Sequence, residues 1–145
     1  MLLDFSSLSK FRAEISRIGD SAFHGNTSLF IEDIINKRAP YKVFAVIREE
    51  KAAGFLILST VLDEAEILEV AVSEKSRRCR IGSELMEEVF EWCAKNGISR
   101  IFLEVRESNF QARMYYKKYG FAENGVRKNY YRDPVENAVL MSKKM

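Results

Sequence analysis

The sequence is poor in residues that bind metal ions. Its 145 residues include two cysteines, Cys79 and Cys93, and one histidine, His24. These three side chains cannot form a four-ligand structural zinc site without help from carboxylates. We therefore expect no metal, and His24 reads as an ordinary loop histidine. A chain of this length can bury a core without disulfide or metal staples.

Long apolar runs and proline-rich or glycine-rich linkers are also missing. No apolar run approaches the roughly 18–20 residues of a membrane span, and the beginning of the chain lacks the basic and apolar regions of a signal peptide. No repeat or low-complexity tract divides the sequence. We expect one domain over residues 1–145, soluble and cytoplasmic, with no membrane contact.

An excess of charge of one sign is absent as well. The net charge is +2, from 23 Lys and Arg against 21 Asp and Glu. This balance argues against a nucleic-acid-binding surface, which normally carries a clustered basic stripe. The one dense basic cluster is local, at Lys75, Arg77, Arg78 and Arg80. It favours a small anion such as a phosphate group, with a solvated loop as the alternative.

Apolar periodicity predicts the order of the elements. Helical spacing predicts one helix over residues 8–18 and a second that starts near Asn26-Thr27 and runs towards Arg38. Strand patterns at 42–48, 54–62 and 66–72 predict an antiparallel meander. A helix ending near Lys95, with a strand at 98–105, predicts a parallel crossover, and a helix at 109–119 precedes strands at 121–132 and 137–141. The predicted class is α/β with a mixed sheet: a meander, a βαβ unit, a closing hairpin and flanking helices.

Strand 66–72 alternates in polarity. Ile67, Glu69 and Ala71 are predicted on one face, opposite Leu68, Val70 and Val72. The helix after it places Cys93 on its apolar stripe, so that thiol should be buried. Cys79 lies in the basic loop, where neighbouring cations could activate a thiol; an incidental loop cysteine is the alternative.

The loop Arg77-Arg78-Cys79-Arg80-Ile81-Gly82 joins a predicted strand to a predicted helix. A helix start offers unpaired N–H groups and a positive dipole end, which together bind anions. Here the chain resembles the GNAT acyltransferase superfamily, whose coenzyme A loop follows the pattern Arg/Gln-x-x-Gly-x-Gly/Ala. Four segments are similar to the bacterial ribosomal-protein-alanine N-acetyltransferases (the RimI group): 62–72, Leu103-Glu104-Val105-Arg106-Glu107-Ser108-Asn109, 116–121 and 127–131. The match spans about residues 51–141.

The resemblance implies acetyl-CoA as the co-substrate. The edge of strand 68–72 would bind the pantetheine arm, and loop N–H groups would hold the pyrophosphate. The implied cofactor-binding residues are Leu68, Val70, Ala71, Val72, Arg77, Arg78, Cys79, Arg80, Ile81, Gly82, Ser83, Asn109 and Tyr116. Two strands splayed at their ends would form the slot where the thioester meets the amine.

The resemblance also implies the catalytic groups. Glu104 would act as general base and Tyr116 as general acid, and the N–H of Val70 would stabilise the carbonyl oxygen. Structural alternatives stay open: Glu104 could pair with Arg106 or Arg127, and Tyr116 could be a core aromatic beside Tyr115 and Phe121.

The acceptor side is less sharply indicated. Glu69 could line the acceptor pocket or form a salt bridge. One of Tyr130 and Tyr131 should close the peptide pocket, and Tyr131 is favoured. Close relatives usually carry Phe-Pro-Trp-Ser where this chain has Phe23-His24-Gly25-Asn26, a difference that concerns the acceptor rather than the reaction.

Arg80 is the main departure from the family pattern, which has glycine at this position. A Cβ could crowd the pyrophosphate or force a conformation that glycine permits. If φ is negative, Arg80 would cost little and its guanidinium could grip phosphate.

These features predict an acetyl-CoA-dependent transferase acting on a protein N-terminal amine, such as the N-terminal alanine of a small-subunit ribosomal protein. The alternatives are acetylation of a small amine or a lysine side chain, or a coenzyme A-binding domain without turnover.

Overall fold

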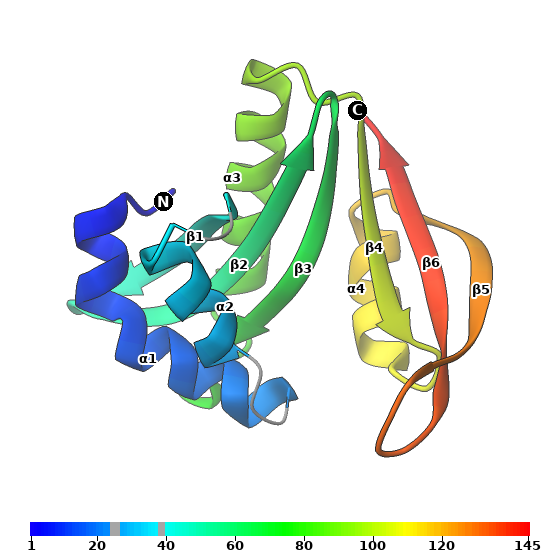
Figure 1. Ribbon diagram of the computed structural model, residues 1–145, viewed down its shortest axis with the longest axis horizontal. Helices are drawn as coiled ribbons and strands as arrows, with labels where there is room; N and C mark the ends of the chain where they lie inside the picture. The colour runs from blue at the N-terminus through cyan, green and yellow to red at the C-terminus, as the bar shows by residue number, and fades with distance from the viewer. Residues whose placement is uncertain (24–26, 38–39) are drawn as a thin grey trace.

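A six-stranded mixed sheet with helices on both faces forms the protein (Figure 1). This computed structural model describes residues 1–23, 27–37 and 40–145. The helices are α1 (Phe5–Phe23), α2 (Thr27–Ile35), α3 (Ile81–Lys95) and α4 (Phe110–Lys118), with a short 3₁₀ turn, η1 (Glu74–Ser76). The strands are β1 (Lys42–Arg48), β2 (Lys51–Val61), β3 (Glu64–Val72), β4 (Arg100–Arg106), β5 (Ala122–Tyr131) and β6 (Glu136–Lys144).

The strand order across the sheet is β1-β2-β3-β4-β6-β5. The meander β1–β2–β3 is antiparallel, β3 and β4 are parallel through the α3 crossover, and β5 with β6 forms the closing hairpin. The predicted mixed α/β architecture is confirmed. The hairpin joins the sheet through its second strand, β6, which leaves β5 at the edge.

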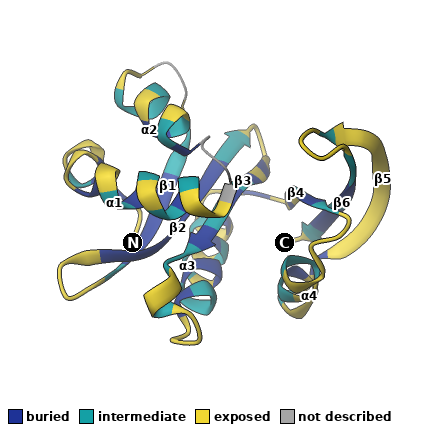
Figure 2. Ribbon diagram, turned by 90° about the horizontal axis from the view of Figure 1, so that it is seen from below, coloured by how far each residue is buried: buried dark blue, intermediate teal, exposed yellow. Residues whose placement is uncertain are grey.

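Two apolar clusters hold the layers together. The larger lies between the sheet and helices α3 and α4, and includes Leu85, Val89 and Leu103. The smaller lies between the meander and helices α1 and α2, and includes Ile15 and Phe55. Figure 2 shows α1 and α2 on one side of the sheet and α3 and α4 on the other. Over β4, β6 and β5, no described helix covers the side of the sheet where α1 and α2 lie (Figure 2).

Element limits differ from the predicted ones mainly at turns. The strand at Lys42–Arg48 matches its prediction, but β2 begins three residues earlier than expected, at Lys51. Glu49 and Glu50 both have positive φ and complete a tight turn by themselves. Helix α1 begins before the predicted helix because Asp4 accepts a hydrogen bond from the N–H of Ser7 at 2.8 Å, which caps its first turn.

The predicted alternation of β3 is wrong at Ile67 and at Leu68, which packs on the α1 and α2 side with Ala71. The β2–β3 pairing shifts between Ile57 and Leu58, so that Ile57 opposes Glu69 and Leu58 opposes Ile67. This β-bulge at Leu68 inserts one residue and exchanges the two faces of the strand. Ile67 therefore packs towards α3 together with Val70, whereas Glu69 stays on the opposite face from the valines, as predicted.

Strands β3 and β4 pair along only half of their length. The paired residues run from Glu64–Arg100 to Ile67–Leu103. Beyond them, β3 continues to Val72 and β4 to Arg106 without pairing with each other. Figure 1 shows the two strands diverging below this point. The predicted splay is present, and it begins at the bulge. We refer to the opening between residues 68–72 and 104–106 as the interstrand gap.

Cys93 is fully buried, as predicted, and burial raises the pKa of its thiol to about 11. Within residues 1–23, 27–37 and 40–145, no helix is both long enough and apolar enough to cross a membrane.

Candidate active site

The basic loop leads directly into α3. Arg77, Arg78, Cys79 and Arg80 are all exposed, and Ile81 begins the helix. In the first turn the N–H of Glu84 donates to the carbonyl of Arg80 at 3.0 Å, while the preceding N–H groups, of Ile81, Gly82 and Ser83, are the ones that a helix start leaves without intrahelical partners. Exposed cations around free N–H groups at the positive end of a helix suit a phosphate anion.

Arg80 has φ of 63°, in the left-handed region, and is the N-cap of α3. An arginine at this position would cause little backbone strain only if its φ were negative, and it is not. Its side chain forms no capping hydrogen bond and reaches Glu87 at 3.7 Å in an exposed ion pair. Arg80 thus holds a backbone conformation that glycine adopts with less strain.

Gly82 lets α4 approach the loop. A Cβ at this position would lie 3.0 Å from the Tyr115 ring, and the Tyr115 hydroxyl donates to the Gly82 carbonyl at 2.7 Å. Ser83 and Tyr119 are joined by a hydrogen bond between their hydroxyls. These contacts fix the start of α3 against α4, so the loop has a defined place beside the interstrand gap.

The edge of β3 presents backbone groups to this gap. The N–H of Ser73 donates to the carbonyl of Ala53 at 2.8 Å, and Val72 opposes Gly54. Hydrogen-bonded and non-hydrogen-bonded pairs alternate in an antiparallel ladder, so Ala71 bonds to β2 whereas Val70 and Val72 point their N–H and C=O groups away from β2. Of the predicted pantetheine contacts on this strand, Val70 and Val72 therefore face the gap, and Ala71 does not.

Glu104 lies on the uncovered face of the sheet, next to the gap. It lines a cavity of about 610 Å³, and its Oε1 is 3.4 Å from Nη2 of Arg127. Of the two cationic partners considered for Glu104, the structure selects Arg127. Arg106 instead pairs with Glu136 at 3.2 Å.

Glu66 is a wall residue of this cavity that the sequence reasoning did not single out. Burial raises the pKa of its carboxyl, and the nearby Glu104 raises it further, while Arg127 lowers it. Glu66 opposes Phe102 in the parallel pairing and therefore shares a face with Glu104. Residues two apart on a strand lie on the same face, so Glu66, which opposes Phe102, could have been placed beside Glu104 once the β3–β4 register was known.

Tyr116 lies on the other side of the sheet, in the core beneath α4. It packs edge-on against Tyr115 and Phe121, with ring-centroid separations of 5.3 and 5.8 Å. Tyr116 is therefore a core aromatic residue, as the structural alternative predicted. Burial, with a smaller contribution from Tyr131, raises the pKa of its hydroxyl well above the ordinary tyrosine value. No described residue accepts a hydrogen bond from this hydroxyl. Packing and a chemical role are compatible here.

Tyr131 ends β5 close to both Tyr116 and Glu104. Burial raises the pKa of Tyr131 to about 12, and Glu104 contributes to the rise. Its ring contacts that of Tyr130 at 5.0 Å. Tyr130 is more exposed, and Arg127 stacks on it at 5.1 Å.

Glu69 is buried beneath α1 and α2 rather than at the cavity. Both carboxylate oxygens accept from the Thr27 hydroxyl at 2.8 Å, and burial raises the pKa of Glu69. It forms no ion pair with a described residue. Gly19 on α1 permits this arrangement, because a Cβ there would collide with Thr27 at 1.9 Å. The salt-bridge alternative for Glu69 is not seen among the described residues, and a role of Glu69 in acceptor binding stays a prediction.

Asn109 caps α4, since its side chain accepts from the N–H of Ala112 at 3.1 Å. A coenzyme A contact by Asn109 stays a prediction. The departure from the family pattern at Phe23-His24-Gly25-Asn26 concerns residues 24–26 and the Phe23 side chain, which lie outside the described residues.

Comparison with known proteins agrees with this geometry. The model of the acetyltransferase (GNAT) family matches residues 11–121. The [ribosomal protein bS18]-alanine N-acetyltransferase of Haemophilus influenzae is 38% identical over 110 residues, 74% of this chain and 75% of that protein. The Escherichia coli enzyme of the same name is 36% identical over 109 residues, 74% of each chain.

Solved structures extend the likeness to the whole fold. The crystal structure of the ribosomal-protein-S18-alanine N-acetyltransferase from Escherichia coli superposes with a TM-score of 0.82 and 31% identity, over 99% of this chain and 91% of that one. Ard1 from Thermoplasma volcanium gives 0.80 and 28%, over 100% and 95%. The family model matches most of the chain, and both curated relatives are more than 30% identical over about three quarters of it; the chain therefore belongs to the GNAT family and is an acetyl-CoA-dependent N-acetyltransferase.

Proposed function

We propose that this protein transfers the acetyl group of acetyl-CoA to the α-amino group at the N-terminus of an acceptor protein, with the N-terminal alanine of a ribosomal protein as the leading acceptor. The observation that carries the proposal is the placement of Glu104 and Tyr116 on opposite faces of the sheet beside one interstrand gap. An amine arriving over the uncovered face would meet Glu104. A thioester arriving from the α3–α4 face would meet Tyr116.

Acetyl-CoA supplies an activated acyl group, and the chain offers a place for each of its parts. The N–H groups of Ile81, Gly82 and Ser83 would hold the pyrophosphate with the exposed loop arginines. Val70 and Val72 would bond the pantetheine arm as a strand edge bonds an added strand. The N–H of Val70 would also donate to the acyl oxygen as negative charge develops there.

Glu104 is the proposed general base. An α-amino group has a pKa of about 7.7–8.0, so a carboxylate can take its proton at neutral pH, directly or through one water. Arg127 contacts the carboxylate oxygen Oε1, and the Tyr130 hydroxyl also hydrogen-bonds to this carboxylate. A carboxylate has about four lone-pair sites, so it can still accept from the amine or a water.

Tyr116 is the proposed general acid. A tyrosine hydroxyl carries its proton at neutral pH, and burial raises the pKa of Tyr116 further, so the hydroxyl can donate as charge develops on the leaving sulfur. Its ring is held by Tyr115 and Phe121, so the position of the hydroxyl oxygen is fixed.

The cavity favours a peptide over a small amine. Its walls follow β4 from Arg100 to Glu104, a length of about 13 Å at roughly 3.3 Å per residue. That length accommodates several residues of an extended chain. The names of the two bacterial relatives, both ribosomal protein bS18-alanine enzymes, support an alanine-bearing N-terminus.

The test is thiol release from acetyl-CoA with a short peptide that bears a free N-terminal alanine. The control is the same peptide with a blocked N-terminus and one lysine. Release with the free peptide alone is expected. Release with both peptides would favour lysine acetylation. Silence with both, together with coenzyme A binding measured by calorimetry, would favour a binding domain without turnover.

A further inference from the structure

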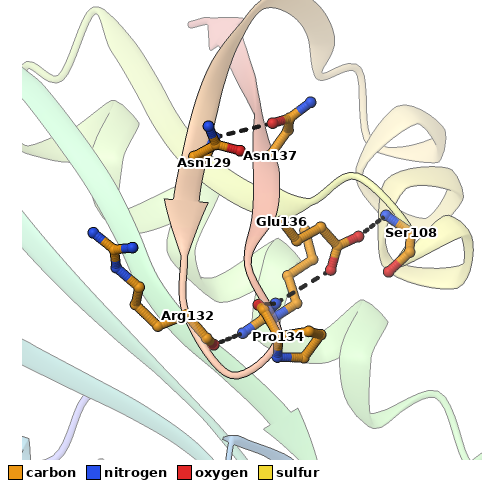
Figure 3. A network of polar contacts seen from close by, with 7 residues as sticks. Ser108, Asn129, Arg132, Pro134, Glu136 and Asn137 are labelled. Carbon is orange, nitrogen blue, oxygen red and sulfur yellow. Dashed lines mark hydrogen bonds and ion pairs between the residues drawn. The ribbon is translucent and has the colours of Figure 1, made fainter.

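The turn between β5 and β6 is held by a single guanidinium, that of Arg106. Arg106 donates to the carbonyl of Arg132 at 2.9 Å, to the carbonyl of Pro134 at 3.1 Å and to Glu136 at 3.2 Å. Figure 3 shows Arg132, Pro134 and Glu136 gathered at this turn. The two ends of the turn are thus tied to the last residue of β4.

Glu136 extends the network to the segment after β4. Its second carboxylate oxygen accepts from the N–H of Ser108 at 2.6 Å, as drawn in Figure 3. Asn137 adds three contacts. Its Oδ1 accepts from the N–H of Asn129 at 3.0 Å, its carbonyl accepts from the N–H of Glu107 at 3.0 Å, and its Nδ2 donates to the Glu107 carboxylate at 3.3 Å. Arg106 and Ser108 belong to the Leu-Glu-Val-Arg-x-Ser-Asn segment but have no role in the proposed chemistry. These hydrogen bonds give both residues a structural role.

Arg106 also reaches the candidate active site through one ring. Its guanidinium carbon lies 4.5 Å from the centroid of Tyr131, within cation–π range. Tyr131 is close enough to Tyr116 to contribute to the raised pKa of that hydroxyl, and close enough to Glu104 for the carboxylate to raise the pKa of Tyr131. Neither Arg106 nor Tyr131 lines the cavity; the route from Arg106 to the acceptor side runs through Tyr131 to Glu104, which does line it.

Lysine cannot replace this guanidinium. The contacts use Nη1 and Nη2 in different directions while the planar group lies over a ring. An ammonium is a point charge without that fork or that plane. Arg106→Lys therefore keeps the positive charge and removes only the planar, forked arrangement of hydrogen-bond donors.

Resting on the proposed function, we propose that Arg106 is a positioning residue that holds Tyr131 and the β5–β6 turn at the acceptor side of the interstrand gap and thereby sets the affinity for the acceptor peptide. It touches neither the acetyl group nor the amine. The competing explanation is that Arg106 only stabilises the fold.

Arg113 provides a matched control. Its guanidinium also joins a carboxylate (Glu123, 2.8 Å), a backbone carbonyl (Glu107, 2.6 Å) and a ring (Phe110, 5.3 Å). The ring that it contacts, Phe110, is an exposed residue at the start of α4. Loss of Arg113 should therefore affect stability without affecting the acceptor site.

The experiment compares Arg106→Lys and Arg113→Lys in steady-state kinetics and thermal unfolding. For Arg106→Lys we expect the KM of the free-alanine peptide to rise about tenfold, equal to ~1.4 kcal/mol, with the KM of acetyl-CoA changed less than about twofold. For Arg113→Lys both KM values should stay within about twofold at a comparable fall in Tm. Parallel changes of both KM values in Arg106→Lys, or an unchanged peptide KM, would overturn the proposal.

A double-mutant cycle tests the route through Tyr131. Tyr131→Leu added to Arg106→Lys should raise the peptide KM little beyond either single change, because both remove the same contact. Additive effects would contradict action through Tyr131. Wild-type protein that releases no thiol with any free N-terminal peptide would defeat the proposed function itself and this inference with it. If the wild type is active, the peptide KM of Arg106→Lys decides the inference independently of the proposed function.

Discussion

The Glu104 carboxylate lies 3.4 Å from the Arg127 guanidinium at the wall of the cavity beside the interstrand gap. The side chain of Glu104 is 18% exposed, whereas that of Arg127 is 55% exposed. An ion pair with so exposed a partner contributes little to stability. The ion pair alone therefore gives little reason for a glutamate at the end of the β3–β4 pairing, where the proposed base is needed.

Glu104→Gln is expected to lower kcat/KM for the free-alanine peptide by about 100-fold near neutral and acidic pH. The loss should shrink above about pH 8, where the α-amine deprotonates without help. The measurement is a pH–rate profile of both proteins. Arg127→Gln, which removes the ion pair and keeps the carboxylate, is the control and should change the rate much less. An unchanged rate between pH 6 and 8 would remove Glu104 from the role of base.

Tyr116→Phe should slow turnover about 100-fold and leave coenzyme A affinity almost intact. The ring contacts with Tyr115 and Phe121 survive this change, so Tm should stay close to that of the wild type. Single-turnover kinetics and calorimetric titration with coenzyme A separate the two effects. A collapse of affinity would identify Tyr116 as a binding residue instead.

Arg80→Gly should stabilise the protein by about 0.5 kcal/mol, because relief of the left-handed strain exceeds the entropy that glycine adds to the unfolded chain. The same change should lower the Kd of coenzyme A, since the backbone could approach the phosphates more closely. Arg80→Ala is the control: it removes the charge but keeps the Cβ, and should weaken binding without raising Tm. If Ala and Gly behave alike, only the charge matters at this position.

Thr27→Val should destabilise the protein by about 2 kcal/mol at pH 8, because it removes the donor to a buried carboxylate. Burial raises the folded-state pKa of Glu69, so this group favours the folded state at low pH and that contribution is lost as pH rises through its folded pKa. The Thr27 hydroxyl opposes the rise, and its loss should therefore matter more at pH 8 than at pH 5.

Urea unfolding at these two pH values measures the difference, with Thr27→Ser as the control that keeps the hydroxyl. An equal loss at both pH values would show that Thr27 contributes packing alone.

The apolar pattern was enough to predict the order of elements, the mixed sheet and the buried Cys93, because burial repeats with the period of each helix or strand. The motifs around Glu104 and the basic loop were enough to predict the family. Residue limits at Glu49–Lys51 were not predictable, since a turn with positive φ leaves little mark on polarity.

Features that depend on pairing between distant segments, such as strand register and side-chain contacts, were decided only by the tertiary structure. The bulge at Leu68 moves Ile67 to the other face and starts the interstrand gap, and its position depends on the register of β2 against β3. Likewise Arg127 rather than Arg106 contacts Glu104, and Glu69 accepts from the Thr27 hydroxyl beneath α1 and α2. Local sequence sets the period of each element, but which side chains meet depends on strand register, which is fixed only when the whole core packs.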